Sequence, residues 1–74
     1  MGKEIILNEK LKEEIFDAGI DTARLWGAEC LSFEVNFEDK VISFTCIEHG
    51  EMFNAPYSFK DFKDEYNIDL EALI

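Results

Sequence analysis

The sequence predicts an α+β fold in which helices pack on one face of a three-stranded antiparallel meander sheet, in the order (β)ααβββα. Three successive patterns support this prediction. Apolar residues recur at helical spacing up to about residue 28, alternate with polar residues between residues 30 and 47, and return to helical spacing near the C-terminus. The 74 residues suffice for a single compact domain, residues 1–74, without a linker or a repeat.

The first helix is predicted to start after Asn8, whose side chain can cap the first turn. The apolar run over residues 5–7 precedes it as either a brief strand or an anchoring segment. Gly19 is expected just past the end of this helix, where glycine is favoured. The apolar stripe of the helix consists of Leu11, Ile15, Phe16 and Ala18.

A second, shorter helix is predicted over residues 22–28, with Asp21 as its N-cap. Leu25 and Trp26 are the apolar residues expected to anchor it to the core. Because Gly27 lowers helix stability, this helix should have about two turns at most.

Strict alternation from residue 30 predicts a half-buried strand that ends in a turn at residues 38–40. A second strand follows over residues 41–47, and His49-Gly50 predicts a tight turn into a third strand. The third strand, residues 52–55, is expected to stop at Pro56, which cannot donate to a ladder and belongs at a sheet edge. The core-facing residues should be Leu31, Phe33, Val35 and Phe37 in the first strand and Ile42, Phe44 and Cys46 in the second.

The last helix is predicted to begin after Ser58, which with Asp61 resembles a capping box. Phe59, Phe62 and Tyr66 recur at i, i+3 and i+7, and this spacing predicts an aromatic stripe against the sheet. A short apolar turn is expected over residues 69–74.

The chain carries 17 acidic and 7 basic side chains, a formal net charge of −10. This exceeds the charge of about 2–8 units that suffices for solubility of a small domain, and self-repulsion opposes folding. We therefore expect an acidic surface directed at a cationic partner, with simple solubility as the alternative. Direct binding of nucleic acid or of an anionic membrane is disfavoured, because both require Lys and Arg. No apolar stretch is long enough to span a membrane and no signal peptide opens the chain, so a cytoplasmic location is expected.

Side chains suited to catalysis or metal binding are sparse. Cys30 and Cys46 are expected to be reduced thiols in apolar strands. Cys46 and His49 have a C-x-x-H spacing but lack the further ligands that zinc requires. The adjacent carboxylates of Glu13 and Glu14 do not face each other on a helix, and no glycine-rich phosphate loop is present. The sequence therefore predicts a binding protein and not an enzyme, with no catalytic residue, metal site or cofactor.

Most of the excess acidity falls in residues 29–74. In overall character, as a small, acidic and aromatic-rich α+β domain without catalytic groups, the chain resembles the small inhibitors of phages and mobile elements, among them anti-CRISPR proteins and DNA mimics. The resemblance implies a non-enzymatic inhibitor that binds the basic nucleic-acid-binding surface of a host enzyme, such as a CRISPR effector or a nuclease. Carboxylates about 5–7 Å apart along a strand or helix can stand in for a few successive phosphates. The acidic residues expected to contact the partner are Glu34, Glu38, Asp39, Glu48, Glu51, Asp61, Asp64 and Glu65.

A second interpretation is an acidic interaction module, such as a subunit, an adaptor or an antitoxin-like partner of a basic protein, without mimicry of nucleic acid. An apolar patch would then supply most of the affinity, and salt would matter little. Under the first interpretation, Tyr57 or Met52 is the apolar contact expected to support the acidic surface. Pairing of exposed strand edges would allow a homodimer under both interpretations.

Overall fold

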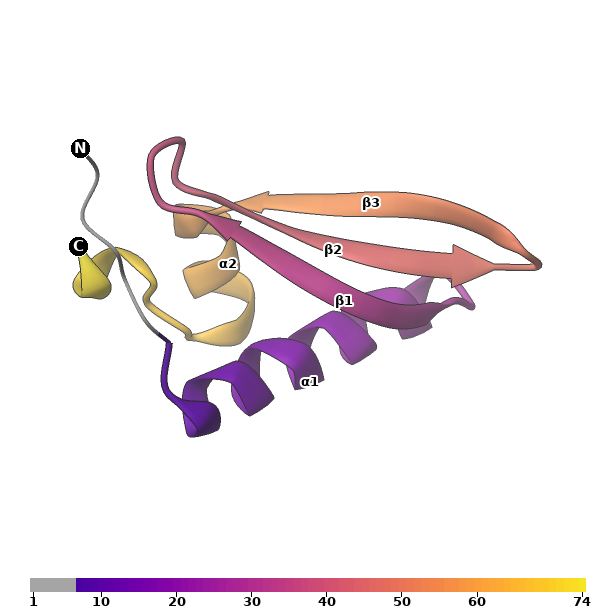
Figure 1. Ribbon diagram of the computed structural model, residues 1–74, viewed down its shortest axis with the longest axis horizontal. Helices are drawn as coiled ribbons and strands as arrows, with labels where there is room; N and C mark the ends of the chain where they lie inside the picture. Colours follow the sequence, from indigo (N-terminus) through magenta and orange to yellow (C-terminus); the bar gives the residue numbers. More distant parts are fainter. Residues whose placement is uncertain (1–6) are drawn as a thin grey trace.

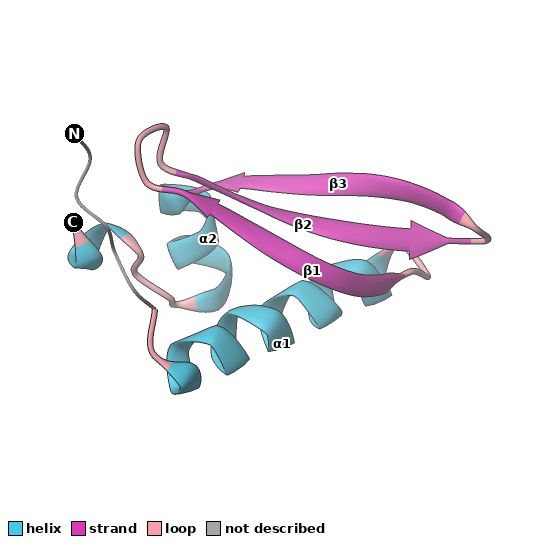
Figure 2. Ribbon diagram, viewed as in Figure 1, coloured by secondary structure: helices cyan, strands magenta, loops and turns pink. Residues whose placement is uncertain are grey.

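The computed structural model describes residues 7–74 and has an α+β architecture, with both helices on the same face of one sheet (Figure 1; Figure 2). The predicted class and meander are confirmed, because the strand order is β1-β2-β3 and both neighbouring pairs are antiparallel. The strand considered for residues 5–7 lies outside the described residues except for Leu7, which is half-buried ahead of the first helix. The elements are α1 (Glu9–Leu25), β1 (Glu29–Asn36), β2 (Val41–Glu48), β3 (Glu51–Ser58), α2 (Phe59–Tyr66) and a final 3-10 turn, η1 (Glu71–Leu73).

A single helix, α1, replaces the two N-terminal helices that the sequence predicts. Gly19 lies inside this helix and is buried. A Cβ atom at Gly19 would lie 2.6 Å from Cδ1 of Phe44 and 2.8 Å from Sγ of Cys30. Glycine is therefore required there for close packing of the helix on the sheet, and it does not end the helix. Asp21 is an exposed residue within α1, so its predicted role as an N-cap was wrong.

The end of α1 lies at the second glycine, Gly27, which has a φ of 70°. The N–H of Ala28 donates to the carbonyl of Ala23, and the N–H of Gly27 donates to that of Arg24, at 2.9 and 3.1 Å. This pair of bonds is the Schellman motif, which satisfies the last carbonyls of a helix. The motif places Leu25 and Trp26 at the surface, with 73% and 64% exposure, so neither is the core residue that the sequence predicts.

The sheet buries one face against the helices. The central strand, β2, contributes Ile42, Phe44 and Cys46 to that face, as predicted, and all three are fully buried. The register shifts between Cys30 and Ser32, which marks a β-bulge in β1. Because of the bulge, Leu31 leaves the core face and is 47% exposed, contrary to the simple alternation in the sequence. Cys30 takes its place opposite Cys46.

The third strand continues through Pro56 to Ser58, so the predicted stop at Pro56 was wrong. Pro56 lies opposite Ser43 on an edge strand. A proline is tolerated there when its nitrogen faces away from the neighbouring strand, where no ladder bond is lost. The predicted turn at His49-Gly50 is confirmed, with φ values of 51° and 81° that are typical of a two-residue type I′ hairpin.

Helix α2 packs on the core at the end of the sheet that carries the β1–β2 turn. Ser58 caps it as predicted, accepting a hydrogen bond from the N–H of Asp61 at 3.1 Å. Phe59 and Phe62 are buried, and the ring of Phe62 lies 5.8 Å from that of Phe44. The predicted aromatic stripe therefore packs on the sheet, at separations where aromatic pairs are favourable.

We expect Gly19→Ala to lower the free energy of unfolding by about 1–3 kcal/mol, because the added methyl group cannot fit between Phe44 and Cys30. At an open helical position the same change would instead add about 0.5–1 kcal/mol. Chemical denaturation followed by circular dichroism measures the difference. Asp17→Ala, at an exposed position of the same helix, is the control and should change stability by less than about 0.5 kcal/mol. A more stable Gly19→Ala variant would contradict the close packing.

Candidate functional site

Most of the acidic residues predicted to contact a partner lie at one end of the sheet. The turn between β1 and β2 is adjacent there to the start of α2 (Figure 1). The N–H of Phe59 donates to the carbonyl of Lys40 at 3.0 Å, and the rings of Phe37 and Phe59 lie 5.7 Å apart. We call the exposed acidic residues of these two segments the turn–α2 group; it consists of Glu38, Asp39, Asp61, Asp64 and Glu65.

The acidic turn has a defined conformation. The amide of Asn36 donates to the carboxylate of Asp39 at 3.1 Å, and the N–H of Asp39 donates back to the side-chain oxygen of Asn36 at 2.9 Å. Lys40 follows with a φ of 57°, a left-handed conformation that reverses the chain. On α2, Asp61 lies in the first turn, where the helix dipole favours a negative charge. These carboxylates are therefore carried by ordered backbone.

Two of the three lysines near the turn–α2 group are paired with other carboxylates. Nζ of Lys40 lies 4.0 Å from Oε2 of Glu71, and Nζ of Lys63 lies 3.4 Å from Oδ2 of Asp69. Lys60, also on α2, is exposed. Within residues 7–74, no member of the turn–α2 group forms an ion pair with Lys or Arg. The C-terminal segment thus takes up two of the local cations and leaves the predicted residues available to a partner.

The remaining predicted residues lie elsewhere. Glu34 is exposed in the middle of β1, on the sheet face away from the helices. Glu48 and Glu51 face each other at the tip of the β2–β3 hairpin, roughly 25 Å from the turn–α2 group along the strands. Carboxylates directly opposite each other on a ladder repel. The structure therefore distributes the predicted set over both ends and the middle of the sheet and does not gather it on one face.

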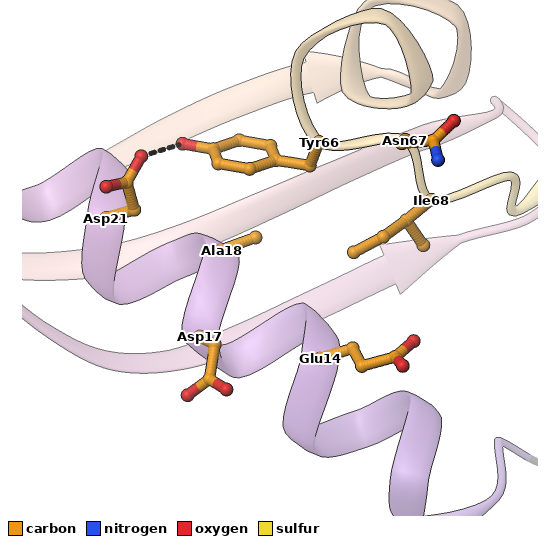
Figure 3. A pocket seen from close by; sticks show the side chains of 7 residues that line it. All are labelled: Glu14, Asp17, Ala18, Asp21, Tyr66, Asn67 and Ile68. Atoms are coloured by element: carbon orange, nitrogen blue, oxygen red, sulfur yellow. Dashed lines mark hydrogen bonds between the residues drawn. The ribbon is translucent and has the colours of Figure 1, made fainter.

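Further acidic residues form a surface on α1 that the sequence analysis did not assign to a site. Glu14, Asp17 and Asp21 line a cleft of about 450 Å³ between α1 and the C-terminal end of α2, where Tyr66 and the following Ile68 form the other wall (Figure 3). Their spacing of three and four residues places them on one side of a helix. This signal was present in the sequence, but the expected helix end at Gly19 separated Asp17 from Asp21.

Tyr66 links this cleft to the core. Its hydroxyl donates to Oδ2 of Asp21 at 3.3 Å (Figure 3). It is also hydrogen-bonded to the hydroxyl of Thr22, which is buried. Thr22 in turn bonds the hydroxyl of Tyr57 at 3.1 Å. Burial is the main cause that raises the pKa of Tyr66 to about 12, with smaller contributions from Tyr57 and Asp21. The phenol is therefore neutral at ordinary pH and joins α1, β3 and α2.

Cys46 and His49 do not come together as a nucleophilic pair or as a pair of metal ligands. Cys46 is fully buried, whereas His49 is exposed in the hairpin turn. Burial raises the pKa of both thiols, Cys30 and Cys46, which disfavours a reactive thiolate. Within residues 7–74, no three His, Cys, Asp or Glu side chains are grouped so that they could hold a metal ion.

An apolar groove runs beside the edge strand β3. It has a volume of about 400 Å³ and lies between β3 and the C-terminal end of α1. Trp26, Phe53 and Tyr57 line it, and Met52 lies next to Phe53 with 64% of its surface exposed. Of the two apolar contacts predicted from the sequence, Met52 is thus exposed and Tyr57 is half-buried in this groove.

The chain matches no family model, no curated protein and no solved structure. None of the helices formed by residues 7–74 combines the length and the apolar content needed to cross a lipid bilayer. The functional inference therefore rests on the surface geometry described above.

The titration of Tyr66 is a direct check on the hydroxyl network. In a Tyr57→Phe variant, Tyr66 is the remaining tyrosine, and because burial is the main cause of its raised pKa we expect its tyrosinate absorbance to appear well above pH 10 in the folded protein. After denaturation it should appear near the ordinary tyrosine value of 10.0. Because the folded pKa is the higher one, the contribution of Tyr66 to stability is complete below pH 10 and is lost as the pH rises towards 12. A native titration close to 10 would show that the phenol is solvated.

Proposed function

We propose that this protein is a non-enzymatic inhibitor that binds a cationic, nucleic-acid-binding surface of another protein in competition with nucleic acid. The turn–α2 group is the surface that makes the contact. The observation that carries the proposal is that these carboxylates are exposed and unpaired with Lys or Arg within the described residues, while Lys40 and Lys63 beside them pair with Glu71 and Asp69.

The geometry of the group supports competition with a phosphate backbone. Asp61 and Glu65 are one helical turn apart, which separates them by about 5–6 Å. The ordered turn places Glu38 and Asp39 next to the same helix, so the acidic surface extends over two segments. A partner with Lys and Arg arranged for phosphates would meet several carboxylates at once. The resemblance in overall character to phage-encoded inhibitors makes a nuclease or a CRISPR effector the proposed class of partner.

A second candidate function is a protein-interaction module without nucleic-acid mimicry. The groove beside β3 favours it, because Trp26 is a large apolar side chain left at the surface there, next to the partly buried rings of Phe53 and Tyr57. Exposed apolar groups of this kind, close together, mark interaction sites. Binding through them would resist salt, whereas binding through the turn–α2 group would weaken as ionic strength rises.

Neutralising the acidic surface tests the proposal. The test variant carries Glu38→Gln, Asp39→Asn, Asp61→Asn and Asp64→Asn, and the matched control carries Glu9→Gln, Glu13→Gln, Glu14→Gln and Asp17→Asn on α1. Both variants lose the same charge. Immobilised protein is used to capture partners from a lysate of its own host cell, and each captured protein is then purified and assayed for nucleic-acid binding.

We expect wild-type protein to displace DNA or RNA from the captured partner, and salt to weaken the complex. The test variant should bind roughly tenfold more weakly, since each exposed charge contact contributes a few tenths to 1 kcal/mol, and the control should bind nearly as well as wild type. Equal affinities of the two variants would show that net charge and not this surface matters. A complex that excess nucleic acid leaves intact would refute competition.

A further inference from the structure

The groove beside β3 combines a free strand edge with an apolar wall. β3 is an edge strand, and Phe53, Ala55 and Tyr57 lie opposite the core-facing residues of β2, so their side chains point to the helix side. Thr22 and Trp26 of α1 form the facing wall of the groove. A chain laid along β3 would therefore direct alternate side chains into the groove.

The outer edge of β3 has backbone groups that form no hydrogen bond with the rest of residues 7–74. Pro56 has no N–H, so it occupies a ladder position whose backbone groups point away from β2, opposite Ser43. Because pairs alternate along an antiparallel ladder, Met52 and Asn54 share this outward orientation. Within residues 7–74, no backbone group outside the ladder pairs with Met52 or Asn54. Each thus offers an N–H and a carbonyl to an added strand, and Pro56 offers a carbonyl.

Charge around the groove indicates the kind of chain it accepts. At the hairpin end, Phe53 also lines a second depression together with Glu48 and Glu51, the two opposed carboxylates. At the other end, Tyr57 is linked through Thr22 and Tyr66 to Asp21. No Lys or Arg of the described chain lines the groove, the hairpin depression or the α1 cleft. A second copy of this chain would bring a further charge of −10 to the same place, so repulsion disfavours pairing of two β3 edges.

We propose that the groove binds an extended segment of a basic protein, which adds to the sheet as a fourth strand beside β3. An apolar side chain of the segment packs against Trp26, Phe53 and Tyr57, and flanking Lys or Arg side chains lie over Glu48 and Glu51. Main-chain hydrogen bonds supply affinity and the pocket supplies selectivity in recognition of this kind. Only the sign of the partner's charge rests on the proposed function; the strand edge and the groove are independent of the turn–α2 group.

The protein contains its own probe for this site, because Trp26 is its one tryptophan and lies in the groove. The ligand to be used is a short peptide with leucine at one position and lysine two residues before and two residues after it, so that all three side chains lie on one face of the added strand. The control peptides replace lysine by glutamate or carry a methyl group on every backbone amide. We expect the first peptide to shift the emission of Trp26 to shorter wavelength and to protect it from acrylamide. The two controls should leave the emission unchanged.

A pair of variants then separates strand addition from charge attraction. Asn54→Pro removes an N–H that points away from β2, at a position related to Pro56 by the alternation of the strand. Asn54→Ala removes the same side chain and keeps the N–H. We expect Asn54→Ala to bind the lysine–leucine peptide like wild type and Asn54→Pro to bind it about fivefold more weakly, the effect of one lost hydrogen bond. Heteronuclear NMR spectra confirm that both variants retain the sheet.

Several outcomes would overturn this proposal. They are equal affinities of the two Asn54 variants, an unchanged Trp26 emission when the peptide binds, and equal binding of the fully methylated peptide. A dimer of the wild-type protein that Asn54→Pro converts to monomers would also overturn it, since a second copy would then be the occupant. Neutralising the turn–α2 group should leave peptide binding in the groove intact. A failure of peptide binding in the groove therefore leaves the proposed competition with nucleic acid unaffected. A failure of that competition likewise leaves the groove proposal unaffected.

Discussion

The close contact between α1 and β2 is the constraint on which the rest of the structure depends. Gly19 lets the helix approach until the ring of Phe44 and the thiol of Cys30 fill the space that a side chain would occupy. Phe44 also packs against the rings of Phe33, Tyr57 and Phe62, so it connects all three strands and both helices. A domain this small buries only about 60% of its unfolded surface, so one well-packed centre must supply much of its stability.

This arrangement also explains how a chain with a net charge of −10 distributes its acidity. The core takes one face of the sheet and one side of each helix, so carboxylates remain on the turns and outer helix surfaces. Repulsion among them is reduced locally where lysine pairs with Asp69 or Glu71. The same pairing leaves the turn–α2 group without internal partners among the described residues. The carboxylates that pair with lysine are thus different from those of the proposed cation-binding surface.

The groove beside β3 arises from the geometry of α1. Because the helix is continuous to Leu25 and ends in a Schellman motif, it carries Trp26 as far as β3. A shorter helix ending at Gly19 would leave β3 without this wall. Pro56 limits how much of the strand edge can accept a partner, a restriction that natural sheets use against aggregation. An edge that is partly blocked and flanked by carboxylates suits a cationic segment better than another copy of the same chain.

The sequence by itself determined the α+β class, the three-stranded meander, the hairpin turn at His49-Gly50 and the negative charge, because each depends on local periodicity, turn chemistry or composition. Only the tertiary structure decided that Gly19 continues a helix, that Pro56 continues a strand and that Leu31 leaves the core at a bulge. These outcomes depend on the tertiary neighbours of each residue. A close contact or an unpaired strand edge can lower the free energy of a conformation that the local sequence preference disfavours. The same distinction applies to the candidate site. Its residue types could be predicted, whereas the adjacency of the β1–β2 turn to α2 is a long-range contact that no spacing along the chain encodes.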